Sequence, residues 1–122
     1  MAENSYVRFA TPDDVRNKAL QLVEVSSETG KVRKGTNEVT KVIERGEAKF
    51  VVIAEGVQPP EVVLHIPLLC EEKGIPYVYV QKKEDLGQKV KLKSSAAVAI
   101  MEPGNAKQLL TELIDKFKEI KK

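Results

Sequence analysis

The sequence predicts an α/β protein, a single-domain three-layer α/β/α sandwich in which helices cover both faces of a small mixed, largely parallel sheet. Segments 50–54, 76–80 and 97–101 are apolar without alternation, which is typical of strands buried on both faces. Apolar residues at helical spacing mark the segments around them. A chain of 122 residues is long enough for one domain with a core and too short for two. We therefore expect residues 1–122 to form one domain with a core over about 6–120.

The first helix is expected to begin with Thr11 as its cap and Pro12 at the first helical position, followed by two acids. Its apolar residues recur at helical spacing until Gly30 ends it. They are Val15, Ala19, Leu22 and Val23. A short strand over 31–34 then leads into a second helix, which ends at Gly46. The apolar stripe of that helix is Val39, Val42 and Ile43.

A third helix is expected from Pro59 to Gly74, with Pro67 either kinking it or shifting its start. Its inward residues are Val62, Val63, Ile66, Leu69 and Cys70. Residues 83–90 are expected to form a short, mostly polar helix, and residues 92–95 a loop. A turn at Pro103-Gly104 precedes the last helix. Apolar residues line that helix at Leu109, Leu110, Leu113, Ile114, Phe117 and Ile120.

The basic residues are unevenly distributed along a chain whose net charge is only +2. Segment 31–49 holds six basic groups against three acids, and segment 82–93 holds five against two. Together the two segments carry +6, so the rest of the chain carries −4. If both segments fold to the same end, they form one electropositive face that suits nucleic acid. Lysine-rich helix surfaces that are merely solvated are the alternative interpretation.

Composition excludes several classes of protein. No apolar run approaches the ~18 residues needed to cross a bilayer, so no membrane role is expected. Residues 1–6 lack the pattern of a secretory leader, and one cysteine fits a reducing compartment, so we expect a cytoplasmic protein. His65 is the only histidine, which disfavours a zinc site or a catalytic triad. Cys70 is expected to be a small buried hydrophobe. Neither common nucleotide-phosphate motif is present, and we expect no cofactor, metal or catalytic residue.

The most informative stretch is Arg33-Lys34-Gly35-Thr36-Asn37-Glu38-Val39-Thr40-Lys41. It predicts a basic strand end, a glycine turn and a helix start that carries an amide and a carboxylate. A helix start attracts phosphate oxygens through its unpaired N–H groups and its dipole. Glu38 would repel a bare phosphate but can accept hydrogen bonds from guanine, and Asn37 can both donate and accept. The stretch therefore suits a nucleic acid held by its backbone and read at a base.

A simpler interpretation of the same stretch remains open at this point. Gly35 could form an ordinary turn, with Thr36 or Asn37 as a helix cap and Glu38 as a partner of the helix dipole. The Gly35 turn, the 56–60 loop and the 92–95 loop are candidates for one shared surface, because ligands of such folds usually meet the loops at one end of the sheet.

Residues 34–41 resemble the L-seven-Ae family of ribosomal and small-ribonucleoprotein proteins in its archaeal form. The resemblance continues through the Pro59-Pro60-Glu61 segment, the H-x-P-L-L-C motif that starts at His65, and Leu86-Gly87. It covers roughly residues 6–120, and the combination of G-x-N-E-x-x-K with H-x-P-L-L-C is highly specific.

The resemblance implies a non-enzymatic protein that binds kink-turns, which are RNA helix–bulge–helix elements built on tandem sheared G·A pairs. Asn37 and Glu38 match the positions that contact the guanines, and Lys41 matches the cation beside them. Gly35 and Thr36 match the backbone that approaches the bend. The positions that would hold phosphates are Arg33, Lys34 and Arg45. Those that match the loop covering the bulged nucleotides are Leu92, Lys93, Ser94, Ser95 and Ala96, and those around the flipped-out base are Gln58, Val62, Lys83 and Ala97.

The implied RNA partners are rRNA of the 23S type, box C/D and H/ACA guide RNAs, and ribonuclease P RNA. Other ribonucleoprotein core proteins are implied as protein partners, and we expect the chain itself to be a monomer. Archaeal members usually carry acids where this chain has Gly56 and Gln58. An amide at Gln58 is therefore expected to change the preference for the flipped base.

Three alternatives stay open at the level of sequence. The chain could be a purely ribosomal protein that contacts mainly rRNA shape. It could be a protein-interaction module that docks through its last helix or through helix 83–90. It could also be an enzyme that uses His65 or Cys70.

Overall fold

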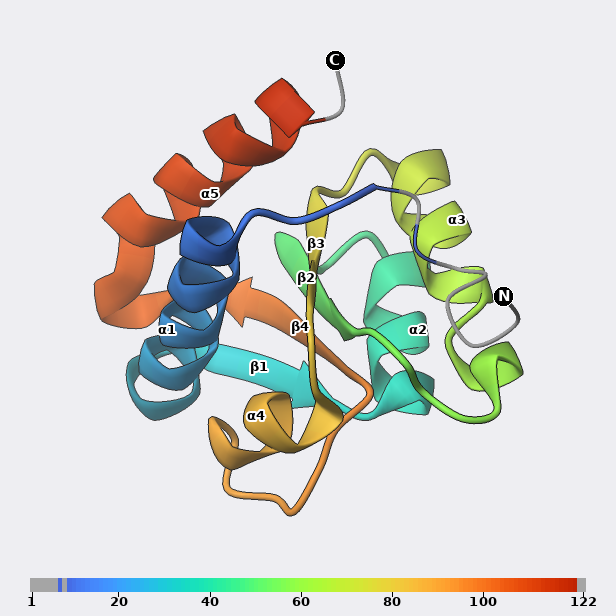
Figure 1. Ribbon diagram of the computed structural model, residues 1–122. Helices are drawn as coiled ribbons and strands as arrows, with labels where there is room; N and C mark the ends of the chain where they lie inside the picture. Colours follow the sequence, from blue (N-terminus) through green and yellow to red (C-terminus); the bar gives the residue numbers. More distant parts are fainter. Residues whose placement is uncertain (1–6, 8, 121–122) are drawn as a thin grey trace.

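The computed structural model describes residues 7 and 9–120, in which a four-stranded sheet lies between helices (Figure 1). The strands are β1 (Lys31–Lys34), β2 (Phe50–Ala54), β3 (Tyr77–Val80) and β4 (Ala97–Glu102). The α-helices are α1 (Asp13–Thr29), α2 (Thr36–Glu44), α3 (His65–Lys73), α4 (Lys83–Gln88) and α5 (Lys107–Ile120). Short 3₁₀ helices, η2 (Pro60–Val62) and η3 (Gly104–Ala106), precede α3 and α5. The segment 1–6, for which the sequence predicts no secretory leader, lies outside the described residues.

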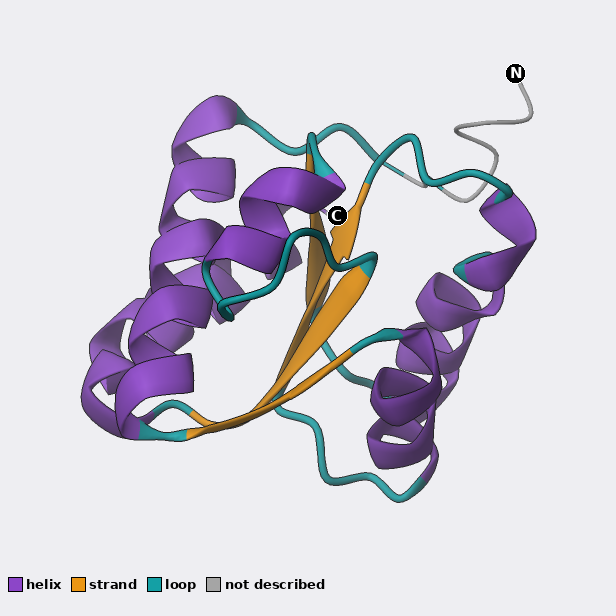
Figure 2. Ribbon diagram, turned by 90° about the horizontal axis from the view of Figure 1, so that it is seen from below, coloured by secondary structure: helices purple, strands orange, loops and turns teal. Residues whose placement is uncertain are grey.

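The helices form two outer layers around the sheet. Helices α2 and α3 pack together on one face, and α1, α4 and α5 gather on the other (Figure 2). This arrangement confirms the predicted three-layer α/β/α sandwich. Among the described residues, no helix combines the length and the apolar character that crossing a membrane requires.

The sheet has the strand order β1-β4-β2-β3. Strands β2 and β3 pair in parallel, whereas β4 is antiparallel to both β1 and β2. The predicted mixed sheet is confirmed, but the expected predominance of parallel pairing is wrong. Helix α4 has only six residues, about 9 Å of helix, and is too short to carry the chain back along the sheet. Strand β4 therefore starts at the end of the sheet where β3 finishes. It inserts between β1 and β2, which both run in the opposite direction.

The core lies on both faces of the sheet, around β2, β3 and the first part of β4. All five residues of β2 and all four residues of β3 are buried, as the continuous apolar runs predicted. The predicted inward residues of α1 and α2 are buried as well. The rings of Tyr77 and Tyr79 form an aromatic cluster with Phe9 and Phe117, with Phe9 only 5.1 Å from Tyr79 between ring centroids. This cluster joins the segment before α1 and helix α5 to the edge strand β3.

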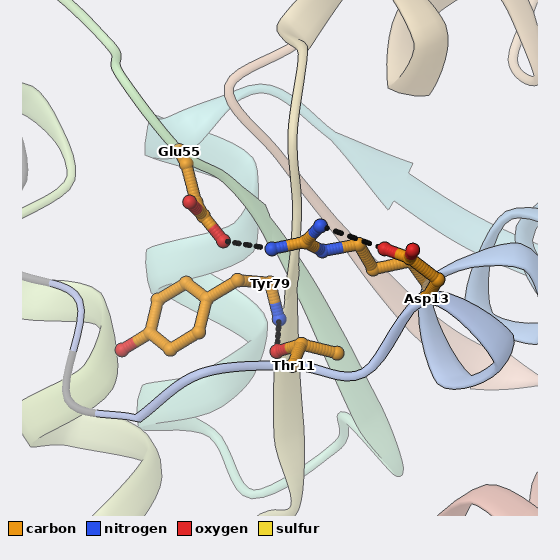
Figure 3. A network of polar contacts seen from close by, with 5 residues as sticks. Thr11, Asp13, Glu55 and Tyr79 are labelled. Carbon is orange, nitrogen blue, oxygen red and sulfur yellow. Dashed lines mark hydrogen bonds and ion pairs between the residues drawn. The ribbon is translucent and has the colours of Figure 1, made fainter.

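Thr11 does not cap α1, contrary to the sequence prediction. The residue before the helix is Pro12, and Thr11 is buried with its Oγ1 accepting a hydrogen bond from the backbone N–H of Tyr79 at 3.2 Å (Figure 3). Strand β3 is the edge of the sheet, so its outward N–H groups lack a strand partner. The hydroxyl of Thr11 satisfies one of these buried donors.

Helix α3 begins at His65, later than the sequence predicted, after the separate turn η2. Pro67 lies in its first turn, where a missing N–H costs no intrahelical hydrogen bond. The prediction that Pro67 shifts the start of this helix is therefore confirmed. Val62 was expected to face inward but lies in η2 and is 40% exposed, because the chain changes direction between the two helical segments.

Candidate nucleic-acid interface

The carboxyl ends of β1, β2 and β3 and the amino end of β4 meet at one edge of the sheet, in the lower part of Figure 1. The register shows this directly, because Lys34 at the end of β1 lies opposite Val98, and Ile53 near the end of β2 lies opposite Ala97. The predicted sharing of one surface by the three loops is thus confirmed. We call this surface the loop edge and define it by residues 33–38, 55–62, 81–83 and 89–96.

Gly35 starts helix α2 at the loop edge. Its φ of 91° lies in a region that side chains rarely adopt, its N–H donates to the Ala97 carbonyl at 3.1 Å, and its own carbonyl accepts from Val39 N at 3.0 Å. Gly35 is therefore the residue before the helix, and Thr36 and Asn37 are the first two helical residues. The cap that the simpler interpretation assigned to Thr36 or Asn37 is therefore wrong, whereas its turn at Gly35 and its acid Glu38 in the first turn of the helix agree with the structure. No side chain among the described residues caps α2, so its first-turn N–H groups are available to a ligand.

Asn37, Glu38 and Lys41 lie on the exposed side of α2. The Glu38 carboxylate and the Lys41 ammonium are 3.4 Å apart, and their side chains are 52% and 57% exposed. Such a solvated ion pair contributes at most about 1 kcal/mol to folding, so both side chains can turn to a ligand at little cost. An amide, an acid and a cation therefore stand together beside the uncapped helix start.

Thr40 connects the first turn of α2 to α3. Its hydroxyl Oγ1 is 2.7 Å from the Thr36 carbonyl and 2.7 Å from Nε2 of His65. A hydroxyl has one proton, so when it donates to Thr36 it accepts from the Nε2–H of His65. His65 is thus hydrogen-bonded within the protein. Its contact fixes the turn of α2 that carries Asn37 and Glu38.

Ser95 is turned inward from the loop before β4. It is 6% exposed, its N–H donates to the Lys83 carbonyl at 2.9 Å, and its hydroxyl donates to the Ala97 carbonyl at 2.9 Å. The sequence interpretation placed Ser95 among the RNA-contacting residues, but its side chain is used within the protein. Ala97 was expected near a flipped-out base, yet it is fully buried in β4 and offers no side-chain surface.

The rest of that loop does face outward. Leu92 is 42% exposed, and Lys93 and Ser94 are also exposed. Ala96 is half-buried, and its carbonyl accepts from Ala54 N at 2.9 Å, which ties the loop to the end of β2. The loop thus presents an apolar side chain, a cation and a small polar residue.

Two predicted phosphate contacts lie at the end of β1. The Lys34 ammonium donates to the Val90 carbonyl at 3.1 Å, so it joins the β1 end to the turn after α4. Arg33 is half-buried, with one guanidinium nitrogen 3.3 Å from the Val32 carbonyl. Both cations border the start of α2.

The predicted electropositive face is only partly assembled. The five lysines of segment 82–93 belong to the loop edge, but Lys31 begins β1 and Lys49 directly precedes β2, so both lie at the opposite end of the sheet. Arg45 follows the last turn of α2, about 15 Å from Gly35 along the helix axis. Arg45 N donates to the Lys41 carbonyl at 3.1 Å, so Arg45 lies one turn beyond Lys41, but the length of the helix separates it from the predicted site residues at the start of α2.

The loop after β2 supplies the remaining predicted residues. Gln58 and Val62 are exposed, whereas Val57 between β2 and Gln58 is buried. Lys83, half-buried at the first position of α4, lies at the same edge. These positions follow neighbouring strands β2 and β3 and therefore border one another along the sheet.

An ion pair that the sequence did not predict anchors this loop. The Glu55 carboxylate lies 3.3 Å from the Arg16 guanidinium, which also lies 3.1 Å from the Asp13 carboxylate (Figure 3). The Arg16 and Glu55 side chains are only about one-fifth exposed, and 39 residues separate them in sequence. No local motif marks such a pair, which is why it was missed.

Catalytic chemistry finds little support in the geometry. Burial, and to a lesser degree the charge of Glu71, raises the pKa of the Cys70 thiol to about 12, so the buried Cys70 is protonated at neutral pH. Within residues 7 and 9–120, no three His, Cys, Asp or Glu side chains cluster as a metal ion would require.

The chain is similar to known proteins over most of its length. Residues 17–110 match the ribosomal protein L7Ae/L30e/S12e/Gadd45 family. The chain is 58% identical to the large ribosomal subunit protein eL8 of Thermoplasma acidophilum over 120 residues, which are 98% of this chain and 99% of that protein. It is 55% identical, over the same shares, to the protein of that name from Thermoplasma volcanium. Among solved structures, the Giardia lamblia 15.5kD RNA binding protein superposes with a TM-score of 0.85 at 30% identity, covering 94% of this chain and 96% of that one.

Proposed function

This chain belongs to the ribosomal protein L7Ae/L30e/S12e/Gadd45 family, and from that premise we propose that it recognises and stabilises kink-turn RNA through the loop edge. It is an RNA-binding protein of the large ribosomal subunit and not an enzyme. The finer proposal is that it binds tandem sheared G·A pairs. Its cellular place would be the cytoplasm, and it would bind as a monomer.

The observation that carries the proposal is the first turn of α2. Asn37 and Glu38 are exposed at an uncapped helix start, with Lys41 beside them. Ionised Glu38 only accepts hydrogen bonds, so it suits the N1–H and N2–H₂ donors of guanine, and Asn37 suits the donors and acceptors of either purine. Phosphate alone would be repelled by Glu38, so a site built this way reads a base rather than an anion.

A kinked duplex is the kind of RNA that such a helix start can reach. Regular A-form RNA hides its base edges in a deep, narrow groove, so sequence reading requires a distorted site. Sheared G·A pairs at a sharp bend open that groove to the first turn of α2. The protein would then stabilise the bent conformer because it binds that conformer better than the open one.

The rest of the loop edge would hold the bent backbone and the unpaired nucleotides. Arg33, Lys34, Lys83 and Lys93 supply cations around the helix start, and binding should weaken with salt as counterions are released. Leu92 offers an apolar surface to a bulged base. Gln58 and Val62 would border a flipped-out base, with Gln58 offering an amide where archaeal relatives usually carry an acid.

A protein that binds this motif can enter several particles. We propose that its targets include rRNA of the 23S type, box C/D and H/ACA guide RNAs, and ribonuclease P RNA, together with the other core proteins of those particles. A gel-shift titration with one kink-turn from rRNA and one from a guide RNA tests this breadth. Comparable affinity for both supports the multiple role, and tight binding to the rRNA element alone would reduce the function to that of a ribosomal protein.

The test of kink-turn recognition itself uses two RNAs that differ only in the G·A pairs. One RNA carries the tandem sheared G·A pairs, and the second RNA, its Watson–Crick twin, carries Watson–Crick pairs at the same positions. We expect tight binding to the first and weak, strongly salt-dependent binding to the second. Equal affinity for the two RNAs at every salt concentration would reject the proposed recognition.

A further inference from the structure

Gly87 is a glycine inside a helix, where glycine is disfavoured relative to alanine. Its backbone is helical, so no unusual dihedral angle explains it. The explanation is space, because a Cβ at Gly87 would lie 2.4 Å from Cα of Ser94 and 2.6 Å from its N and C atoms. These are backbone atoms and cannot move aside as the end of a flexible side chain can. Helix α4 and the loop 89–96 therefore cross at a point where only glycine fits.

The loop is fixed to α4 on both sides of this crossing. Leu92 N donates to the Gly87 carbonyl at 2.9 Å, and Ser95 N donates to the Lys83 carbonyl at 2.9 Å. Between those two bonds lie Lys93 and Ser94, which are exposed at the loop edge. The position of Lys93 and Ser94 is therefore set by the packing of this loop against α4.

The same unit is also joined to the start of α2. The Ala97 carbonyl accepts two hydrogen bonds, from the Ser95 hydroxyl at 2.9 Å and from Gly35 N at 3.1 Å. Lys34 adds a second link through its bond to the Val90 carbonyl at 3.1 Å. The crossing at Gly87 thus fixes where the loop stands relative to the helix start that carries Asn37 and Glu38.

We propose that Gly87 is a positioning residue that sets the spacing between loop 89–96 and the start of α2, and thereby determines the affinity for the unpaired nucleotides of the RNA. The inference rests on the proposed function. It attributes the position of the loop to its packing against α4 at Gly87, which itself need not touch the RNA, and it gives Ser95 the same positioning role.

An alanine at position 87 would shift the loop in a predictable way. To bring its Cβ from 2.4 Å to the 3.4 Å of ordinary contact, the loop backbone must move outward at Ser94. The hydrogen bond from Gly35 N to the Ala97 carbonyl, which holds the start of α2, does not involve Gly87. Contacts to the unpaired nucleotides should therefore weaken, while the reading of the G·A pairs is retained.

The experiment combines protein variants with RNA variants. Gly87→Ala is compared with Gln88→Ala, an exposed neighbour on the same helix, and with Ser95→Ala, which removes only a hydroxyl. Each is titrated against a kink-turn RNA and against the same RNA whose unpaired nucleotides keep their sugar–phosphate backbone but lack bases. Thermal melting of each variant establishes that it folds.

We expect Gly87→Ala to lose about tenfold in affinity on the intact RNA and little on the abasic RNA, which is the coupling expected of groups in contact. Ser95→Ala should show a smaller loss with the same dependence on the RNA, and Gln88→Ala should match the wild type. The inference would be overturned if Gly87→Ala lost equal affinity on both RNAs or lost none. If Gly87→Ala does not fold, the same comparison of the two RNAs with Ser95→Ala decides. The wild-type contrast between the G·A RNA and its Watson–Crick twin is measured alongside, so a failure of kink-turn recognition is distinguished from a failure of this proposal.

Discussion

Removing the Glu38 carboxylate should weaken RNA binding strongly while leaving the fold almost unchanged. The side chain is 52% exposed and its ion-pair partner among the described residues is the equally solvated Lys41, so losing the pair costs folding at most about 1 kcal/mol. Loss of an acid from the first turn costs a further ~0.3–1 kcal/mol through the helix dipole. If the carboxylate reads guanine, Glu38→Ala should cost about 1–3 kcal/mol in binding, which is roughly 5- to 150-fold in Kd.

The sign of this effect separates a specific contact from general electrostatics. RNA is a polyanion, so removing an acid from its binding surface should by charge alone tighten binding. The matched control is Glu44→Ala, which deletes the same charge from an exposed position in the last turn of the same helix. We expect Glu44→Ala to bind as well as the wild type or slightly better. Glu38→Gln, which keeps the shape but adds donors and removes the charge, should lose preference for guanine.

The assay is a gel-shift titration at fixed ionic strength with the kink-turn RNA and its Watson–Crick twin, together with thermal melting of each protein. Glu38→Ala should lose affinity mainly for the RNA that carries the G·A pairs. If Glu38→Ala binds that RNA as tightly as Glu44→Ala does, or loses equally on both RNAs, the assignment of Glu38 to base reading is refuted.

Four further predictions concern Lys34, Thr40 and Cys70. Lys34→Ala should weaken binding to both RNAs and lower the slope of log K against log salt by about one, and an unchanged slope would contradict its contact with phosphate. Thr40→Val removes the hydroxyl that links α2 to His65, so the free energy of unfolding should fall by about 1 kcal/mol in denaturant titration, whereas Thr40→Ser should restore it. Burial raises the pKa of Cys70 from 9.0 to about 12, so at pH 8 only roughly one thiol in ten thousand is ionised and a thiol reagent should label the folded protein far more slowly than the unfolded one. Because the thiol ionises more readily when unfolded, the stability due to its neutral form is complete below pH 9 and is lost as the pH rises toward 12, which pH-dependent denaturation can measure.

Local patterns in the sequence determined the helices and strands and singled out the residues that we propose for recognition. Continuous apolar runs identified β2, β3 and β4, because a strand buried on both faces has no polar alternation. The glycine followed by Asn37 and Glu38 identified the start of α2, because helix starts depend on a few neighbouring residues. The same short stretch carried the family resemblance that comparison then confirmed. Its role in reading G·A pairs stays a prediction.

Only the tertiary structure decided how these elements pair and which side chains reach the surface. Strand β4 lies between β1 and β2 because the connection through α4 is short. No pattern within the sequence of β4 predicts this position. Ser95 was expected to be an exposed loop residue, but its hydroxyl donates a hydrogen bond to the Ala97 carbonyl. Arg45 belongs to a basic segment of the sequence, but the length of α2 separates it from the loop edge.

The physical reason is the range of the interactions involved. Helix starts, turns and buried strands arise from contacts within a few residues, so their signals can be read along the chain. The hydrogen bond from Tyr79 N to the Thr11 hydroxyl, the ion pair of Arg16 with Glu55 and the lack of space at Gly87 each depend on groups brought together by folding. The sequence by itself determined which groups stand at the start of α2, where we propose that RNA binds, and the tertiary structure decided how firmly and at what spacing those groups are held.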